Sequence, residues 1–237
     1  MKKILITLLF APVMALASGA AIHLDRAPDV QGNLPALQNG AKLFVNYCLN
    51  CHGASFVRYN RLTELGLTEQ QIKENLMFTA DKIGEPMRVA IRADEARKWF
   101  GATPPDLTLV TRARSSEHGS GADWVYTYLR SFYQDEKRPT GWNNVVFENV
   151  GMPHVLYELQ GTQVLNHETH KLQLLKAGTQ SPQTYDENVR DLVGFLVWMS
   201  EPVASYRKHL GWLVLAFLAV LFVVTYALKK EYWKDIH

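Results

Sequence analysis

Apolar residues recur at helical spacing in four stretches of this chain. Leu37, Ala41 and Phe44, for example, are spaced three or four residues apart and therefore fall on one face of a helix. Thr68 and Gln71 form the pattern of a capping box, in which each side chain satisfies a backbone N–H at the start of a helix. The pattern predicts helices over Asn33 to Leu49, Thr68 to Thr79, Asp123 to Phe132 and Tyr185 to Met199.

The remaining central region is less regular. The sequence contains no internal repeat and no segment of low complexity. Thr162 to Leu175 is predicted to hold a small hairpin. About 190 residues lie between two strongly apolar ends, which is enough for one domain with a sizeable core. We therefore predict a mainly α domain with irregular insertions.

The N-terminal apolar end has the pattern of a secretory signal. Two lysines follow Met1, an apolar run extends from Ile4 to Leu16, and Ala15-Leu16-Ala17 forms a cleavage site. A first transmembrane helix is the alternative, but the run is short and Pro12 interrupts it. Residues 1–17 are therefore predicted to be a signal peptide that exports the rest of the chain.

The C-terminal apolar end is long enough to cross a membrane. Leu210 to Leu228 carries no charge and would form a helix of about 28 Å, against a hydrocarbon core of about 30 Å. Trp212 and Tyr226 lie near its ends, as in an interfacial belt, which favours a membrane helix over a buried core helix. We predict a periplasmic domain over residues 18–206, and a bacterial inner-membrane anchor with a cytoplasmic tail over residues 207–237.

The charge balance argues against one class of function. The chain carries 25 Lys and Arg residues against 23 Asp and Glu residues. Two of the lysines lie in the signal, and three lysines and two acidic residues lie in the tail, so the exported domain is close to neutral. This balance gives no support to nucleic acid binding and predicts no strongly charged docking face.

The main candidate for a binding site in this sequence is Cys48-Leu49-Asn50-Cys51-His52. On a helical turn positions i and i+3 face the same way, so each thiol can reach one vinyl group of a porphyrin. The histidine that follows can then bind the iron as an axial ligand. Because this is the spacing of a c-type haem attachment site, we predict one covalently attached haem c held by Cys48, Cys51 and His52.

Other sites also use two cysteines at this spacing. A thioredoxin-like redox pair lies in a βαβ setting and needs no histidine, and no such pattern surrounds this pair. A zinc site needs four ligands, so the other two would have to be histidines. An iron–sulfur cluster held by four cysteines is excluded, since the chain has only two.

A second axial ligand suits an iron that only exchanges electrons, because it blocks access of substrates. Methionine opposite histidine also raises the reduction potential. Met77 and Met199 lie in amphipathic helical patterns, where a core role is expected. Met87 and Met152 lie beside residues that break regular structure, and spacing favours Met152 slightly. His154, two residues beyond Met152, is a rival ligand.

With these motifs the chain closely resembles a known family, the cytochromes c1, which are the c-type haem subunits of the respiratory cytochrome bc1 complex. The resemblance covers nearly the whole chain after the signal, and Arg138 to Asn144 look especially like proteobacterial members. It rests on Cys48 to His52, Tyr59 with Leu62, Pro104-Pro105-Asp106-Leu107, Arg112-Ala113-Arg114, Gly151-Met152-Pro153, Ser200-Glu201-Pro202 and the C-terminal anchor. It implies a cytochrome c-like haem domain.

The resemblance also implies roles for single residues. In this family the methionine before this proline is the distal haem ligand, which favours Met152 over Met87. The second arginine of the R-x-R pair contacts a haem propionate, and that position is Arg114. A planar guanidinium suits this role, because it can hold a carboxylate with two hydrogen bonds. The Pro104-Pro105 segment is implied to line the haem crevice, and for Arg112 we expect a solvated strand edge.

The sequence departs from the family pattern in two places. His154-Val155-Leu156 follows the methionine where mitochondrial members carry further prolines, so the local loop is expected to differ. Asn60 stands where an arginine is expected, which argues against a haem contact from that position. His167 and His170 have a metal-like spacing, but without a complete zinc-protease motif we expect them to be surface residues.

Electron transfer is the function that the resemblance implies. The haem domain would accept one electron from a Rieske iron–sulfur protein and pass it to a c-type cytochrome, while the anchor packs beside cytochrome b in a dimeric quinol–cytochrome c reductase. None of its own residues would perform acid–base or nucleophilic catalysis. Two alternatives stay open. One is a membrane-tethered c-type cytochrome of a terminal oxidase, and the other is a haem peroxidase or ligand sensor with an open iron position.

Overall fold

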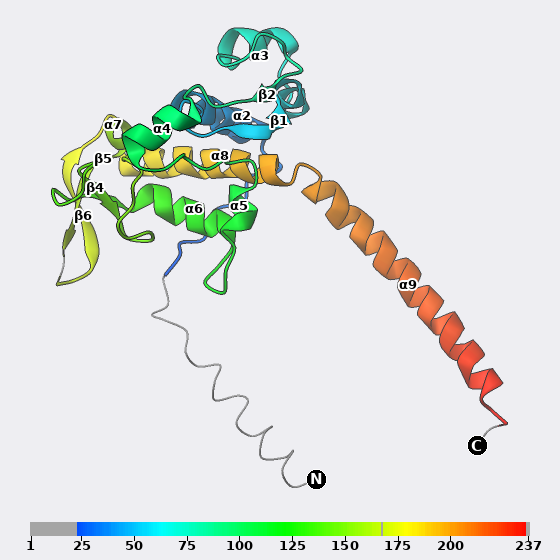
Figure 1. Ribbon diagram of the computed structural model, residues 1–237. Coiled ribbons are helices and arrows are strands. Elements are labelled where there is room, and N and C mark those ends of the chain that lie inside the picture. Colours follow the sequence, from blue (N-terminus) through cyan, green and yellow to red (C-terminus); the bar gives the residue numbers. More distant parts are fainter. Residues whose placement is uncertain (1–22, 167, 236–237) are drawn as a thin grey trace.

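The structure is a computed structural model that describes residues 23–166 and 168–235. It consists of a folded body and one long helix that leaves it (Figure 1). Helix α8 (Pro182–Ser200) runs through the body, with α2 (Leu34–Leu43) and α6 (Gly121–Arg130) packed against it. The predicted mainly α fold is thus confirmed. The signal predicted over residues 1–17 lies outside the described residues.

The helices of the body begin where the sequence supplies capping side chains. Asn33, Ser120 and Ser181 each accept a hydrogen bond from a backbone N–H in the first turn of α2, α6 and α8, respectively. Helix α3 (Glu69–Asn75) begins with the predicted capping box of Thr68 and Gln71. These caps satisfy N–H groups that have no partner within the helix, and so they fix the starting points.

The four predicted helices and the hairpin are confirmed, with changes at their ends. Helix α2 continues into a π-helical segment, η2 (Phe44–Cys48), so the helix predicted from Asn33 to Leu49 widens in its last turn. Helix α3 is shorter than predicted, because Leu76 leaves the helical region with a φ of −130°. Strands β5 (Gly161–Asn166) and β6 (Lys171–Ala177) form the predicted hairpin.

Several short elements were not predicted. Two further antiparallel pairs join β1 to β2 and β3 to β4. Short helices connect the larger ones and bring the loops of the site to the body. The elements are β1 (Ala54–Arg58), η3 (Tyr59–Leu65), β2 (Pro86–Met87), α4 (Ala93–Phe100), α5 (Val110–Ala113), β3 (Phe132–Gln134), β4 (Trp142–Asn144) and α7 (Tyr157–Gln160).

Helices α2 and α8 cross at Gly40, where there is no space for a side chain. A Cβ at Gly40 would lie 2.1 Å from the carbonyl oxygen of Asp191 and 2.7 Å from Cβ of Phe195. Gly40→Ala is therefore expected to lower the free energy of unfolding by about 1–3 kcal/mol, although alanine favours an isolated helix. Chemical denaturation of the haem-loaded, detergent-solubilised protein measures this. Gly32→Ala is the matched control, since nothing lies within 4 Å of that position.

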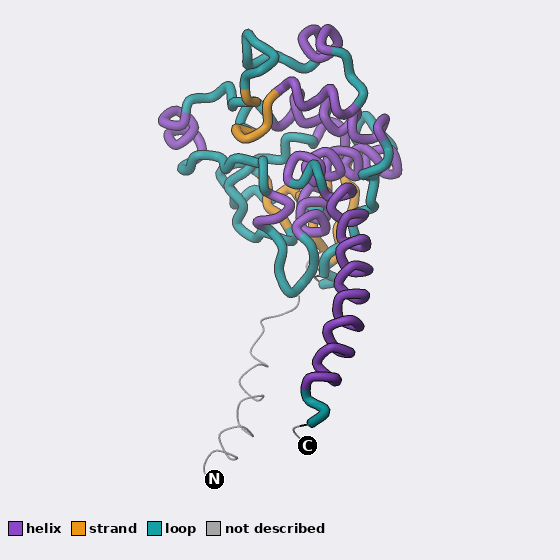
Figure 2. Tube along the Cα trace, turned by 90° about the vertical axis from the view of Figure 1, so that its right-hand side faces the viewer, coloured by secondary structure: helices purple, strands orange, loops and turns teal. Residues whose placement is uncertain are grey.

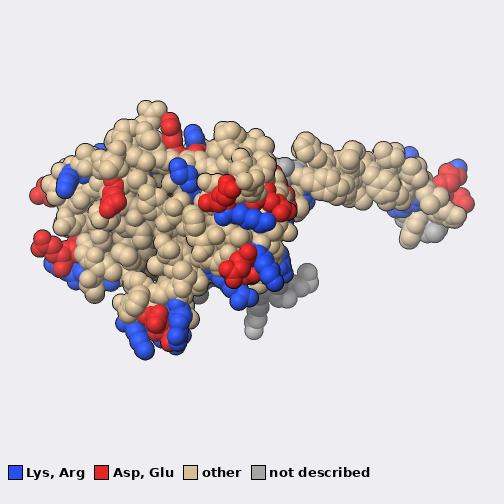
Figure 3. Space-filling view, turned by 90° about the horizontal axis from the view of Figure 1, so that it is seen from above, with Lys and Arg blue, Asp and Glu red and all other residues tan. Residues whose placement is uncertain are grey.

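The long helix α9 (Ala204–Tyr232) extends away from the body in both ribbon views (Figures 1 and 2). Its Tyr206–Tyr232 part is long and apolar enough to cross a membrane, and it is not buried against the body. In the space-filling view, charged side chains are scattered over the body and gather at the far end of α9, while its middle carries none (Figure 3). The predicted C-terminal apolar helix is therefore present.

Polar contacts join the start of α9 to the body. Arg112 lies in α5 and its guanidinium is 3.3 Å from a carboxylate oxygen of Glu201, which also pairs with Arg207 of α9. The strand edge expected for Arg112 is therefore wrong, because the residues around it form a helical turn. The neighbouring Ser200 hydroxyl donates to the carbonyl of Thr108 at 2.8 Å. The Ser200-Glu201 pair thus ties α5 and α9 to the end of α8.

Candidate haem-binding site

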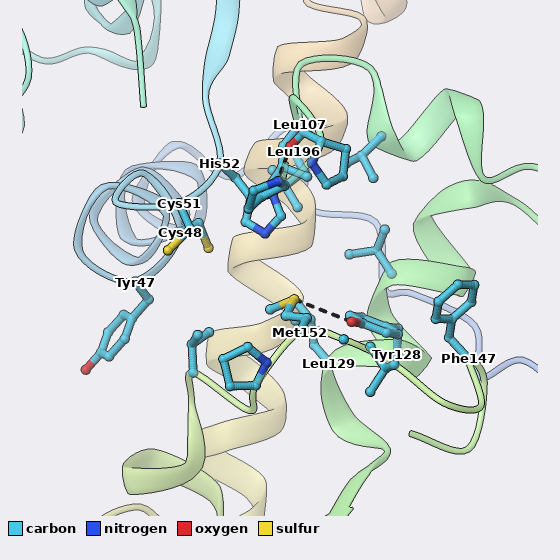
Figure 4. A pocket seen from close by; sticks show the side chains of 18 of the residues that line it. Tyr47, Cys48, Cys51, His52, Leu107, Tyr128, Leu129, Phe147, Met152 and Leu196 are labelled. Atoms are coloured by element: carbon cyan, nitrogen blue, oxygen red, sulfur yellow. Dashed lines mark hydrogen bonds between the residues drawn. The ribbon is translucent and has the colours of Figure 1, made fainter. Parts of the chain in front are cut away.

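An apolar cavity of about 330 Å³ lies between α6, α8 and the end of η2. All five residues that the sequence singles out for haem binding line it, although they come from segments far apart in the chain. These residues are Cys48, Cys51, His52, Arg114 and Met152. Figure 4 shows four of them, Cys48, Cys51, His52 and Met152, around the cavity. Most of the remaining wall is apolar, including Leu107, Val110, Val125, Leu129, Leu192 and Leu196. The cavity is thus suited to a large apolar ring with a few polar groups at its edge.

The two cysteines lie on a tight turn at the end of η2. The carbonyl of Cys48 accepts hydrogen bonds from the backbone N–H of Cys51, at 3.1 Å, and of His52, at 2.8 Å. This turn places both sulfur atoms on the side of the cavity (Figure 4). Burial, with a smaller effect of Cys51, raises the pKa of the Cys48 thiol to about 12, and burial also raises that of Cys51. The two cysteines are not joined by a disulfide.

His52 is held in one tautomer. Its Nδ1 lies 2.8 Å from the carbonyl oxygen of Pro105, which can only accept, so Nδ1 carries the proton. Nε2 is then unprotonated and available to a metal, the arrangement usual for metal-bound histidines. Burial lowers the pKa of His52, although the Pro105 hydrogen bond and the charge of Asp106 oppose this. The ring is therefore neutral at pH 7, as a ligand must be.

The loop that positions His52 is fixed by Asp106. One carboxylate oxygen accepts the backbone N–H of Ser55 at 2.8 Å, and the other accepts that of Thr108 at 2.9 Å. The backbone N–H of Leu107 also donates to the carbonyl of Gly53 at 2.8 Å. Pro104 and Pro105 line the cavity, in agreement with the crevice role that the resemblance implies. The Pro-Pro-Asp-Leu segment and the Cys-His segment are thus joined into one unit.

Asp106→Asn is expected to destabilise the protein at pH 7 more than at pH 3. Burial raises the pKa of Asp106, but hydrogen bonds from Thr108 and Ser55 outweigh this and lower it overall. Its carboxylate therefore contributes stability above the unfolded pKa of about 4, and this contribution is lost as the pH falls through the folded pKa. Denaturation of the unaltered protein and of Asp106→Asn at pH 7 and at pH 3 measures the difference in their free energies of unfolding. An equal difference at pH 7 and pH 3 would contradict the role of the carboxylate.

The loop that carries Met152 is fixed from the β3–β4 hairpin. Asn149 has a φ of 61°, in the left-handed region that asparagine tolerates better than most residues. The guanidinium of Arg138 donates to its side-chain and main-chain oxygens at 2.9 and 2.8 Å. The side-chain oxygen of Asn143 accepts its backbone N–H at 2.8 Å. Arg138 and Asn143 thus support the methionine loop, a role that sequence reasoning missed.

Met152 is the methionine that lines the cavity among the described residues. Its rival Met87 lies in β2, is fully buried and pairs with Ala54 of β1. The other rival, His154, is also buried, where it stacks on Phe132 with ring centroids 4.8 Å apart. Burial lowers the pKa of His154 to about 4. Of the three candidates for the second axial ligand, only Met152 is placed at the cavity.

Arg114 lies at the edge of the cavity with its guanidinium over two aromatic rings. The guanidinium carbon is 4.4 Å from the centroid of Trp124 and 5.5 Å from that of Phe147. No carboxylate pairs with it within residues 23–166 and 168–235. Stacking fixes the plane of the guanidinium while leaving its N–H groups free. Arg114 can therefore offer two hydrogen bonds to a carboxylate in the cavity.

The residues at and beside Asn60, a departure from the family pattern, do not line the cavity. Arg58 donates to the carbonyl of Gly84, and Arg61 pairs with Glu64. Asn60 donates its backbone N–H to the carbonyl of Ile83 and does not line the cavity. His170 lies in the turn of the β5–β6 hairpin, while His167 lies outside the described residues. No haem contact is therefore assigned to this region.

Comparison with known proteins identifies the family of this chain. A profile of the Cytochrome C1 family matches residues 31–236, which include the cavity residues and α9. The chain belongs to the cytochrome c1 family. The resemblance seen in the sequence motifs is thus confirmed. Membership implies haem as the cofactor and electron transfer as the function.

Cytochromes c1 of several bacteria are among the relatives of this chain. A cytochrome c1 of Allochromatium vinosum is 47% identical over 250 residues, which cover 100% of both chains. A cytochrome c1 of Rhodospirillum rubrum is 30% identical over 229 residues, covering 85% of this chain and 82% of its own. A protein of Nitrosomonas europaea, named ammonia monooxygenase gamma subunit, is 49% identical over 236 residues, covering 100% of this chain and 98% of its own. Together with the family match, the two cytochromes c1 support a proteobacterial cytochrome c1.

Proposed function

We propose that this chain is the haem-carrying electron-transfer subunit of a respiratory cytochrome bc1 complex. It accepts one electron at a time from a Rieske iron–sulfur protein and passes it to a c-type cytochrome. The observation that carries the proposal is that His52 and Met152 enter the same apolar cavity from different segments, beside a pair of cysteines (Figure 4). When bound there, haem supplies an iron that changes its charge by one electron.

The chain's own residues fit one covalently attached haem c. Cys48 and Cys51 supply the two sulfur atoms for thioether bonds, and their turn presents both to one cavity. His52 supplies Nε2 as the proximal ligand, because its Nδ1–H is already held by Pro105. Met152 supplies its sulfur as the distal ligand. With His52 and Met152 both holding the iron, it would be closed to substrates and suited to electron transfer alone.

Arg114 is proposed to bind a propionate. Its guanidinium lies at the cavity edge, is stacked on Trp124, and has no carboxylate partner in the described parts of the chain. A buried or half-buried carboxylate without such a partner would be costly, and a bidentate arginine offsets this. The apolar remainder of the wall keeps water from the ring. No residue of the site is assigned a proton transfer or a nucleophilic attack.

Apolar segments near both ends of the chain support a membrane arrangement. We propose that residues 1–17 are a cleaved signal, that the body lies in the periplasm, and that α9 crosses the inner membrane to place residues 229–237 in the cytoplasm. The apolar Tyr206–Tyr232 helix supports the anchor. The helix would pack beside cytochrome b and hold the haem domain near the Rieske protein in a dimeric complex. The polar contacts of Glu201 support a fixed attachment of the anchor to the body.

Purification of the full-length protein from its native membranes tests this proposal. Cytochrome b and a Rieske protein should copurify with it, and quinol should reduce its haem. An inhibitor that holds the Rieske protein away from the haem domain should block that reduction. If the protein instead copurifies with a terminal oxidase, and quinol does not reduce its haem, the proposal is wrong and the tethered oxidase subunit is right.

A further inference from the structure

The hydroxyl of Tyr128 makes its hydrogen bond to the sulfur of Met152. The oxygen lies 3.4 Å from Sδ, and the bond is drawn in Figure 4. Tyr128 comes from helix α6, whereas Met152 comes from the loop before α7, so the contact joins two separate walls of the cavity. No other hydrogen bond of this hydroxyl occurs within the described part of the chain. The contact therefore calls for a reason beyond packing.

The ring of Tyr128 is held in one orientation. It stacks on Trp124 with ring centroids 4.9 Å apart and an angle of 12° between the planes. Phe132 meets it edge to face, at 5.0 Å and 69°. The residue as a whole is only 9% exposed. Because Trp124 of the same helix and Phe132 of β3 fix the ring, the hydroxyl is aimed at Met152 and loses little freedom in making the bond.

The hydroxyl acts as the donor in this bond. A phenol has an ordinary pKa of about 10 and is protonated at physiological pH, whereas a thioether sulfur can only accept. A thioether has two lone pairs, so the sulfur can accept this hydrogen bond with one and bind a metal with the other.

We propose that Tyr128 is a positioning residue that tunes Met152 as an iron ligand. The inference rests on the proposed function, since it requires Met152 to bind the haem iron. Methionine is a soft ligand that favours ferrous over ferric iron. A hydrogen bond to its sulfur would withdraw electron density, making it a weaker donor and a better acceptor toward the iron, so the bond would favour the ferrous state further and raise the reduction potential. It also makes the methionine easier to displace from the ferric iron.

Tyr128→Phe tests this inference, because it removes the hydroxyl and keeps the ring. The variant is made in the full-length, haem-loaded protein, and two properties are measured. The reduction potential should fall. The pH at which methionine leaves the ferric iron, followed by the sulfur-to-iron charge-transfer band, should rise. Tyr126→Phe is the matched control, because Tyr126 lies on the same helix, stacks under Arg130 and does not line the cavity. It should change neither property.

The two measurements separate tuning from packing. If Tyr128 only fills space, its loss would loosen the methionine loop, and methionine would leave the ferric iron at lower pH instead of higher. That result, or an unchanged potential with the charge-transfer band intact, would overturn the role of Tyr128 and leave the proposed function standing. Absence of the band from the unaltered protein would remove Met152 as ligand, and it would overturn both the proposed ligand pair and this inference.

Discussion

Met152→Leu is expected to lower the reduction potential of the haem sharply. Leucine fills a similar volume but offers no lone pair, so the iron loses its distal ligand. The free energy of unfolding should change by less than about 1.5 kcal/mol. Axial ligands set haem potentials over a range of about 0.8 V, so we expect a fall on the order of 100 mV or more. Redox titration of the purified variant measures the shift. Rapid carbon monoxide binding to the ferrous form should appear with it.

The matched control for this prediction is Met87→Leu. Met87 is buried in β2, pairs with Ala54 and does not line the cavity, so its replacement should leave the potential unchanged. Both variants exchange the same side chains at buried or half-buried sites. If Met87→Leu lowered the reduction potential while Met152→Leu left it unchanged, the assignment of the distal ligand would be wrong. The cavity would still be the haem-binding site.

The second large effect is expected from the cysteines. Replacing both Cys48 and Cys51 with alanine should leave no haem attached to the protein after denaturation, because no sulfur atom is left to form a thioether bond. Each single variant should retain some attached haem through the remaining bond. Haem staining after denaturing electrophoresis measures the attached fraction.

Two outcomes of the cysteine experiment decide whether these thiols attach the haem. Haem that stays attached to the doubly substituted chain would contradict the assignment of these two thiols. Full attachment in the unaltered protein, with none in the double variant, would confirm it. The neighbouring Tyr47 provides a control, because it also lines the cavity but carries no thiol. Tyr47→Phe should therefore leave haem attachment unchanged.

The larger helices could be predicted because their signals are local. An apolar face and a capping residue lie within one stretch of sequence, as at Asn33 for α2 and Ser181 for α8. The end of α3 could not be predicted, because the helical spacing of apolar residues continues beyond Leu76 although the backbone leaves the helical conformation there. Strands β1 and β2 pair Ala54 with Met87 across more than thirty residues, and neither strand has a strong pattern of its own. Only the tertiary structure determines that pairing.

The site could be predicted in part for the same physical reason. The cysteine and histidine spacing is a local motif, so it could be recognised without a structure. Met152 and Arg114 needed the family resemblance, because single residues carry no such pattern. The partners that hold the ligands were missed, since they come from distant segments. Asp106 caps the turn after His52 across 51 residues, and Tyr128 reaches Met152 across 24. Arg112 was assigned to a strand edge because its short helical turn has no local signal.

The ligand pair of the haem iron is the central claim, and one spectrum tests it most directly. The full-length protein, purified with its haem, should be low-spin in both oxidation states. Its ferric form should show the charge-transfer band of a sulfur ligand, and the band should be lost in Met152→Leu. A high-spin ferrous haem that binds carbon monoxide rapidly in the unaltered protein would contradict the His52 and Met152 pair, and would favour a peroxidase or a ligand sensor.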